Sequence, residues 1–257
     1  MKYFDNPVKN LAFTFYRLVA PLVPLDKLGR GLMAYPGYVK DLFLYQRADS
    51  SFMRFQDLYP MLHEKTSTTS VDAHYFYQII WLYKHILQVQ PYKHIDVGSQ
   101  YELSGLLSLI TKSFFVDIRP IRTQLPNLKV IEGSILSLPF KDDSIESLST
   151  LHVLEHIGLG RYGDPLDPAG PKKALLELSR VLKSGGKLYL TTPVGKSRTC
   201  FNAHRVFSAK DIIAWCPSLT LKEFSYVADD GSFHEKAPWK NTLNAQYACG
   251  MFVFTKK

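Results

Sequence analysis

One short stretch of the chain gathers side chains that could do chemistry. Residues 149–170, STLHVLEHIGLGRYGDPLDPAG, carry two histidines, a glutamate, an arginine and two aspartates among four glycines. His152, Glu155 and His156 have the H-x-x-E-H spacing of a group of zinc hydrolases, in which both histidines bind the metal. The competing interpretation is an active-site loop that follows a parallel strand and binds no metal.

The elements around this stretch favour the loop. The run IESLSTL, residues 145–151, is typical of a buried strand and leads directly into His152, so the two histidines should not share a helical face. No third ligand follows at a recognisable spacing. We therefore expect no metal, and a zinc hydrolase that uses His152, Glu155 and His156 is kept as a minor alternative.

The segment after the histidines has the composition of a lid or binding loop. It is rich in glycine and proline and too long for a simple connector. Arg161, Tyr162, Asp164 and Asp167 supply donors and acceptors, and the arginine suits a phosphate or a carboxylate. Glu155 and His156 should form a helical turn at the start of this loop.

From residue 91 onwards, short apolar runs alternate with helical patterns. Buried strands are predicted at residues 94–98, 114–118, 129–133, 145–151 and 186–193, and helices at residues 105–112 and 171–182. This alternation predicts an α/β fold with a mostly parallel sheet and helices on both faces. The last two apolar runs, residues 219–231 and 248–257, have no helix between them, so they should pair antiparallel.

Residues 1–90 differ in character. They are aromatic and irregular, and they end in a helical pattern for which Ser70 can supply the cap and which Pro91 terminates. We predict a helical, aromatic-rich N-terminal extension over residues 1–90 and a single domain over residues 91–257.

The chemistry of such a sheet lies at the carboxyl ends of its strands. Asp96 and Gly98 end the first strand, and Asp117 follows Gly98 by 19 residues at the end of the second. A glycine there lets the backbone approach a ligand, and the acid can accept hydrogen bonds from two ribose hydroxyls. The pair indicates a nucleoside-containing cofactor. A dinucleotide, and with it a nicotinamide oxidoreductase, is disfavoured because the sequence lacks G-x-G-x-x-G.

Three further motifs carry a family resemblance. LPFKDDSI (138–145), LEHI (154–157) and ELSRVLKSGGKLYLTTP (177–193) resemble the class I S-adenosylmethionine-dependent methyltransferases. The resemblance implies a Rossmann-like, mostly parallel seven-stranded sheet with an antiparallel last strand, and S-adenosyl-L-methionine as cofactor. The cofactor residues that it implies are Asp96, Gly98 and Ser99 for the methionine part, Asp117 for the ribose, Gly133, Ser134 and Ile135 for the adenine, and His152.

The chain departs from this family at two positions. Gln100 stands where a second glycine is usual, and Ser134 stands where an acid usually accepts from the adenine amine. A narrower resemblance joins residues 67–81, 117–120, 151–170 and 200–208 to a bacterial family known as domain of unknown function 268, which is regarded as methyltransferase-like.

The residues expected to act on the methyl acceptor lie at the same carboxyl ends of the strands. His152 or His156 is the expected base, with His204 next, because a histidine titrates near neutral pH. Residues expected to bind the acceptor are Glu155, Arg161, Tyr162, Asp164, Asn202 and Arg205. The narrower resemblance, to a family associated with surface polysaccharides, together with the basic charge, implies O-methylation of a sugar or another small hydroxylated acceptor in surface glycan biosynthesis. The alternative is a catalytically inactive, methyltransferase-like binding or scaffold protein.

Bulk properties limit the partners. The net charge of +8 is spread along the chain, which suits an anionic, nucleotide-linked or lipid-linked acceptor, and no nucleic-acid motif is present. Three scattered cysteines predict a reducing, cytoplasmic setting. The apolar run 11–23 is too short to span a membrane, but residues 1–30 could contact a membrane surface. No pattern predicts the oligomeric state.

Overall fold

The computed structural model describes residues 8–9, 12, 15–16, 25–48 and 58–257. The chain divides into two compact units, Met1–Ser70 and Val71–Lys257. This boundary lies twenty residues before the predicted one at 90/91. Helix α3 (Ala73–Val89) belongs to the second unit because it buries Trp81, Leu82 and Ile86 in that unit's core.

The first unit contains helix α2 (Leu25–Ala48), which includes Pro36. Many of its apolar side chains are exposed, among them Leu32, Met33 and Phe43. No helix among the described residues is both long enough and apolar enough to cross a membrane. Most of residues 1–30, for which we predicted membrane-surface contact, lie outside the described residues.

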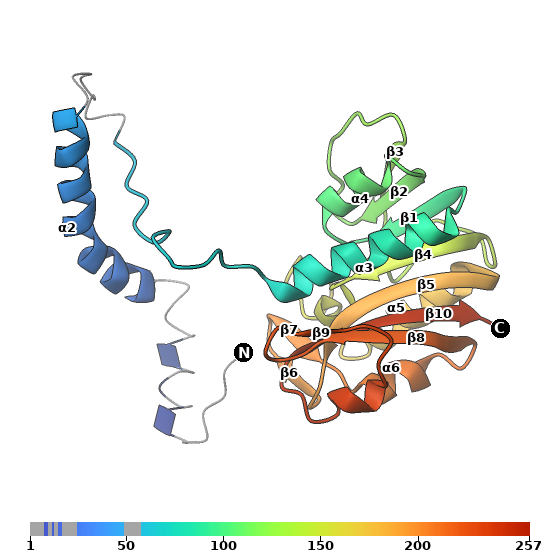
Figure 1. Cartoon of the computed structure of the whole chain (residues 1–257). Helices are drawn as coiled ribbons and strands as arrows, with labels where there is room; N and C mark the ends of the chain where they lie inside the picture. Colours follow the sequence, from blue (N-terminus) through green and yellow to red (C-terminus); the bar gives the residue numbers. More distant parts are fainter. Residues whose placement is uncertain (1–7, 10–11, 13–14, 17–24, 49–57) are drawn as a thin grey trace. The chain divides into compact units, whose positions relative to one another are not determined.

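The second unit is built on one sheet with the strand order β3-β2-β1-β4-β5-β10-β8-β9 (Figure 1). The strands are β1 (Lys93–Val97), β2 (Lys112–Asp117), β3 (Leu128–Glu132), β4 (Ile145–Leu151), β5 (Leu182–Val194), β8 (Leu219–Val227), β9 (Phe233–His234) and β10 (Ala248–Lys256). β1 to β5 pair in parallel, whereas β10 lies antiparallel to both β5 and β8. The predicted seven strands and the antiparallel last strand are confirmed, and β9 adds a two-residue eighth strand at the edge.

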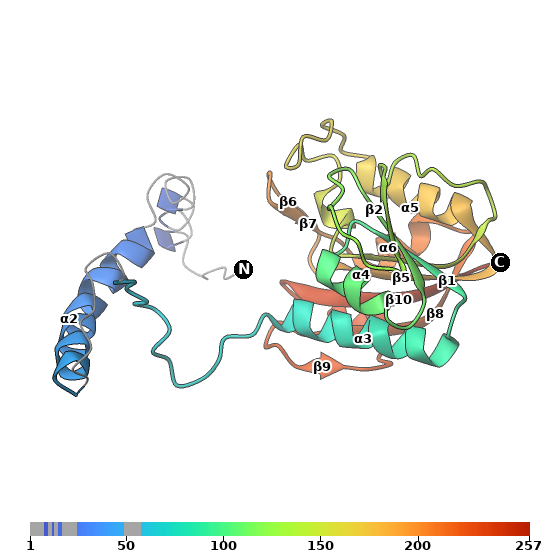
Figure 2. The same cartoon turned by 90° about the horizontal axis from the view of Figure 1, so that it is seen from above.

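Helices cover both faces of this sheet, as Figure 2 shows for α3 and α5 (Gly170–Val181). α3 and α4 (Tyr101–Leu107) share one core cluster, and α5 and α6 (Ala209–Trp215) belong to the other. β4 and the second half of β5 are almost entirely buried, as is usual for central strands covered on both faces.

Two predicted helix boundaries differ from the structure. The helix expected at 105–112 is α4, which begins four residues earlier and ends at Leu107. The cap of α3 is Asp72 rather than Ser70, because the Asp72 carboxylate accepts from the backbone N–H groups of His74 and Tyr75, at 3.0 and 3.3 Å. This cap fixes the first turn of α3, which carries both of those side chains.

Three small elements complete the rim at the carboxyl ends of the strands. A 3-10 turn, η2 (Leu154–His156), follows β4, and a short antiparallel hairpin is formed by β6 (Arg198–Cys200) and β7 (His204–Val206). Another 3-10 turn, η3 (Trp239–Thr242), precedes β10. η2 confirms the turn predicted at Glu155 and His156.

Candidate functional site

A cavity of about 380 Å³ opens beyond the carboxyl ends of β1, β2 and β3. Its size is within the usual range for small-molecule clefts. Seven of the eight predicted cofactor residues line it: Gly98, Ser99, Asp117, Gly133, Ser134, Ile135 and His152. The sequence did not single out other residues in its wall, among them Tyr101, Phe115, Arg119, Ile121 and Leu136.

Gly98 is required by geometry. Its φ of +70° lies in the left-handed region, and an added Cβ would lie 3.1 Å from a methyl carbon of Val153. The glycine therefore lets the loop after β1 pack against the loop after β4, beside the cavity.

Asp96, the eighth predicted cofactor residue, does not line the cavity. Its carboxylate is buried below the loop and accepts from the Ser99 N–H at 3.2 Å, the Ser99 hydroxyl at 2.7 Å, and the Ser149 hydroxyl. Burial raises the pKa of Asp96 to about 6, although these hydrogen bonds oppose the shift. Asp96 thus shapes the loop through Ser99 instead of facing a ligand.

Asp117 and Gly133 stand where they were expected. Asp117 ends β2, and its carboxylate accepts from the Arg119 N–H at 2.6 Å, which orients it at the cavity wall. An added Cβ at Gly133 would lie 3.0 Å from a methyl carbon of Val116, so the strand end admits no larger residue without a shift.

A second cavity, of about 330 Å³, shares His152, His156 and Tyr162 with the first. The predicted residues Glu155, Arg161 and His204 also line it. Its remaining wall is formed by Asp72, His74, Tyr75 and Tyr247, none of which the sequence pointed to individually. The first three belong to the segment 67–81 quoted for the narrower resemblance, which was the available signal.

His152 occupies a constrained position between the cavities. Its φ is +54°, unusual for a residue with a side chain, and its Nδ1 lies 2.6 Å from the buried Glu155 carboxylate. Burial is the largest single influence and disfavours a charged ring, but Glu155 and Cys249 together outweigh it and raise the pKa of His152 well above its usual value. Nε2 of His152 is buried and has no hydrogen-bond partner among the described residues.

His156 has a different environment. Its Nδ1 lies 2.7 Å from the carbonyl oxygen of Ala203, to which Arg161 also donates at 2.8 Å. A carbonyl only accepts, so Nδ1 carries the hydrogen and Nε2 keeps a lone pair in the neutral ring. Burial lowers the pKa of His156, against the attraction of Glu155, so the ring is neutral at pH 7.

His204 lies at the far wall of the second cavity. Burial lowers its pKa to about 4, and its ring packs 5.0 Å from that of Tyr247. Its Nε2 is also buried without a partner among the described residues. The three histidines predicted as bases therefore all face the second cavity, but in different protonation environments.

The loop that follows η2, residues 158–169, is called the lid here, and the carboxylate of Asp164 organises it. Asp164 lines the first cavity, but its carboxylate accepts from the N–H groups of Gly158 and Tyr162, at 2.6 and 3.3 Å. Tyr162 packs under the Arg119 guanidinium, 4.5 Å from the ring centre. This contact fixes Tyr162 against Arg119 in the wall of the first cavity.

Two predicted acceptor residues line neither cavity. Arg205 is buried and donates to the carbonyl oxygen of Ile157 at 2.5 Å, so it braces the loop that carries His156. Asn202 lies exposed in the turn between β6 and β7.

The H-x-x-E-H spacing does not form a helical metal site. His152 precedes η2, so it shares no helical face with His156, as the strand before it predicted. Glu155 lies between the two rings and is bound to His152.

The comparisons with known proteins agree with this architecture. A family model described as a Caenorhabditis protein of unknown function, DUF268, matches residues 130–245. The predicted likeness to this family is confirmed, whereas the description names Caenorhabditis where we expected bacteria. No curated protein matches the chain.

Several solved structures are similar in fold. The YcgJ protein of Bacillus subtilis has a TM-score of 0.50 at 14% identity, over 71% of this chain and 99% of its own. A protein of Galdieria sulphuraria described as a sarcosine dimethylglycine methyltransferase has a TM-score of 0.50 at 15% identity, over 71% and 85%. The chain has the Rossmann-like fold of the class I methyltransferases.

This methyltransferase fold does not by itself specify a reaction. The [4+2]-cyclase SpnF has the same fold, with a TM-score of 0.54 at 12% identity, over 75% of this chain and 84% of its own. The activity has to be argued from the two cavities.

Proposed function

We propose that the chain transfers the methyl group of S-adenosylmethionine to a hydroxyl oxygen of a small acceptor, such as a sugar of a surface glycan. The cofactor binds in the first cavity and the acceptor in the second. The observation that carries this proposal is the shared wall: His152, His156 and Tyr162 line both cavities, so two ligands would meet there.

The first cavity has groups suited to each part of this cofactor. The Asp117 carboxylate suits the two ribose hydroxyls. Phe115, Ile135 and Leu136 offer apolar contacts to a flat base, and the Gly98–Ser99 backbone leaves room for the methionine end. The exposed wall of this cavity is more apolar than polar, which agrees with an adenosyl ligand.

The second cavity suits a polar, ring-shaped acceptor. Its exposed wall is mainly polar, and the rings of Tyr75, His74 and Tyr247 give surfaces on which a sugar could stack. Arg161 and the net charge of +8 agree with a phosphate in a nucleotide-linked or lipid-linked form of that sugar.

His156 is the base that the geometry favours among the three candidates. The acceptor oxygen attacks the methyl carbon, the carbon–sulfur bond breaks, S-adenosylhomocysteine leaves, and the hydroxyl proton passes to Nε2 of His156. That atom carries the lone pair because Nδ1 is bound to Ala203, and the ring borders both ligands. His152 is disfavoured because its ion pair with Glu155 keeps its ring charged.

Transfer of a labelled methyl group tests this proposal. The full chain is incubated with S-adenosylmethionine labelled in the methyl group and with a panel of free, nucleotide-linked and lipid-linked sugars. We expect label in one class of sugar and none with a deoxy analogue that lacks the accepting hydroxyl. A protein that binds the cofactor but labels no hydroxylated acceptor supports the inactive binding protein instead.

A further inference from the structure

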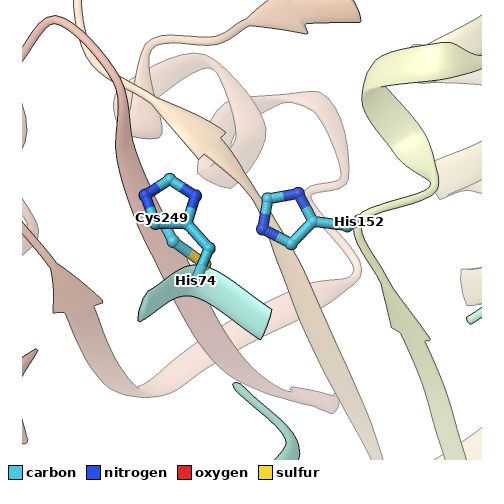
Figure 3. Close-up of side chains that lie close together, drawn as sticks. All are labelled: His74, His152 and Cys249. Atoms are coloured by element: carbon cyan, nitrogen blue, oxygen red, sulfur yellow. The ribbon is translucent and has the colours of Figure 1, made fainter. Parts of the chain in front are cut away.

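Three side chains that take no part in the proposed proton transfer meet beside the second cavity. His74 lies in the first turn of α3, His152 follows β4, and Cys249 is the second residue of β10 (Figure 3). One donor atom from each, a ring nitrogen or the sulfur, lies within 4.8 Å of the other two. Elements far apart in the sequence thus bring two imidazoles and a thiol together.

His152 presents an unusual atom to this cluster. Its side chain is more than nine-tenths buried, and its Nε2 has no hydrogen-bond partner among the described residues. A buried polar atom without a hydrogen-bond partner destabilises the fold. A metal ion on Nε2 would displace the proton that the charged ring otherwise holds there, and would give this buried nitrogen a partner.

Glu155 prepares this nitrogen for a metal. Its carboxylate accepts from Nδ1–H of His152 at 2.6 Å and from the Thr192 hydroxyl at 3.2 Å. A carboxylate behind the outer nitrogen is the usual support of a histidine that binds a metal, because it fixes the tautomer and the ring orientation.

The other two donors are also held in place. Cys249 is fully buried in β10, where it is paired with Pro193 of β5 and Val227 of β8. His74 is placed by the Asp72 cap, and its ring stacks 5.1 Å from that of Tyr247.

We propose that His74, His152 and Cys249 bind a Zn²⁺ ion. One thiolate and two imidazoles are ligands for a borderline-soft cation rather than for Mg²⁺ or Ca²⁺. Bond lengths to Zn²⁺ place tetrahedral ligand atoms about 3.3–3.6 Å apart, which small side-chain rotations supply. The Cys249 thiolate and the buried Glu155 carboxylate together balance the charge of the ion.

The proposed ion would keep one open position. His74 and His152 line the second cavity and Cys249 does not, so the fourth position faces the cavity. Three protein ligands and one open position are typical of catalytic zinc sites. An acceptor oxygen could occupy that position, a consequence that rests on the proposed function, whereas metal binding itself does not.

This site differs from both metal expectations drawn from the sequence. We expected no metal, with the H-x-x-E-H triplet as the minor alternative. Of that triplet only His152 is a ligand here, because Glu155 supports His152 and Nδ1 of His156 is bound to Ala203.

Cobalt substitution tests the site without any cofactor or acceptor. The full chain is stripped with a chelator and titrated with Co²⁺, whose visible bands and thiolate charge-transfer band report tetrahedral binding to sulfur. We expect one Co²⁺ per chain and loss of both signals when one equivalent of Zn²⁺ is added.

Variants assign the ligands. Cys249→Ser should abolish the charge-transfer band, and His74→Gln should weaken Co²⁺ binding by more than the about 10–100-fold typical of a supporting residue. Cys216→Ser is the matched control, because Cys216 is another buried cysteine, in the opposite core cluster. It should bind Co²⁺ as the unchanged protein does.

No Co²⁺ signal in the folded protein would overturn the proposal, as would a thiolate band that persists in Cys249→Ser. If Cys249→Ser does not fold, His74→Gln decides, and unchanged binding in that variant overturns the proposal. Because S-adenosylmethionine is absent, failure here leaves methyl transfer standing, and failure of methyl transfer leaves the metal site standing.

Discussion

The two cavities differ in how they are assembled. The first is walled mainly by the ends of three consecutive parallel strands and the loops that follow them, and seven of its residues were expected from the sequence. The second combines the start of α3, the loop after β4, the lid, β7 and the residue before β10. Six of the ten residues in the second were expected too, because the loop after β4, the lid and β7 carry motifs. The four that were missed come from the start of α3 and from the residue before β10, which no spacing links to those motifs: Asp72, His74, Tyr75 and Tyr247.

The largest expected effect lies where the cavities meet. His156→Ala should reduce methyl transfer by about 10²–10⁴-fold, because the acceptor proton loses its base. The affinity for S-adenosylhomocysteine should fall far less, because the ring is only one of many groups in the wall of the first cavity, whereas it is the base for the acceptor. The rate of label transfer to the sugar identified with the panel measures the first effect. Calorimetric titration with S-adenosylhomocysteine measures the second. Equal losses in His204→Ala and His156→Ala would contradict the assignment of the base.

Asp117→Ala should act on the first cavity alone. Losing charge-assisted hydrogen bonds to two ribose hydroxyls costs about 1.5–3 kcal/mol, or about 10–100-fold in affinity. Calorimetric titration with S-adenosylhomocysteine measures it. Asp211→Ala, at an exposed aspartate of α6, is the control and should bind normally. Normal binding by Asp117→Ala would contradict the proposed hydrogen bonds between Asp117 and the ribose.

A pair of glycines separates backbone strain from packing. Gly98 and Gly163 both have positive φ, at +70° and +86°, but only Gly98 would bring a new Cβ close to another side chain. Each change to alanine should cost about 1–2 kcal/mol for the left-handed backbone. Gly98→Ala should cost more, because of Val153. Urea unfolding measures the free energy of unfolding of each variant. Equal losses would show that the loop shifts to accommodate the added Cβ at Gly98 without further destabilisation.

The last prediction concerns the polar layer under the first cavity. His94 is fully buried, with its ring nitrogens 2.8 and 2.9 Å from the Ser147 and Ser149 hydroxyls, and burial lowers its pKa to about 3. The unfolded chain protonates this ring near pH 6.5, so between these values it binds more protons than the folded chain. Stability should therefore fall as the pH falls, by up to about 1.4 kcal/mol per pH unit from this group.

His94→Gln should remove that contribution, while its amide still offers a donor and an acceptor to the serines. Unfolding free energies measured between about pH 4 and pH 6 should then depend less steeply on pH than in the unchanged protein. Equal slopes would show that folding does not lower the pKa of His94.

Sequence patterns predicted the sheet because buried parallel strands are continuous apolar runs, and they placed Gly98 directly after β1 and Asp117 at the end of β2, where both line the first cavity. They failed where a side chain acts through a neighbour. Asp96 turns under its loop to bind Ser99, and Arg205 turns inward to the Ile157 carbonyl. Nothing in residue type separates these roles from contact with a ligand.

They also failed where distant segments converge. The predicted domain boundary at 90/91 assigned His74 to the N-terminal extension. That boundary followed from the sequence because the helical pattern ends at Pro91, just before the alternating pattern starts. The core contacts of Trp81 and Leu82 join that helix to the second unit. Those contacts are long-range, so no local spacing announces that His74 and Cys249 lie together.

The most direct test of the central claim is a calorimetric titration of the unchanged chain, residues 1–257, with S-adenosylmethionine and S-adenosylhomocysteine, with NADH as the comparison ligand. The account predicts micromolar binding of both adenosyl ligands at one site per chain and no binding of NADH. No binding of either adenosyl ligand by the folded protein, or binding of NADH alone, would contradict it.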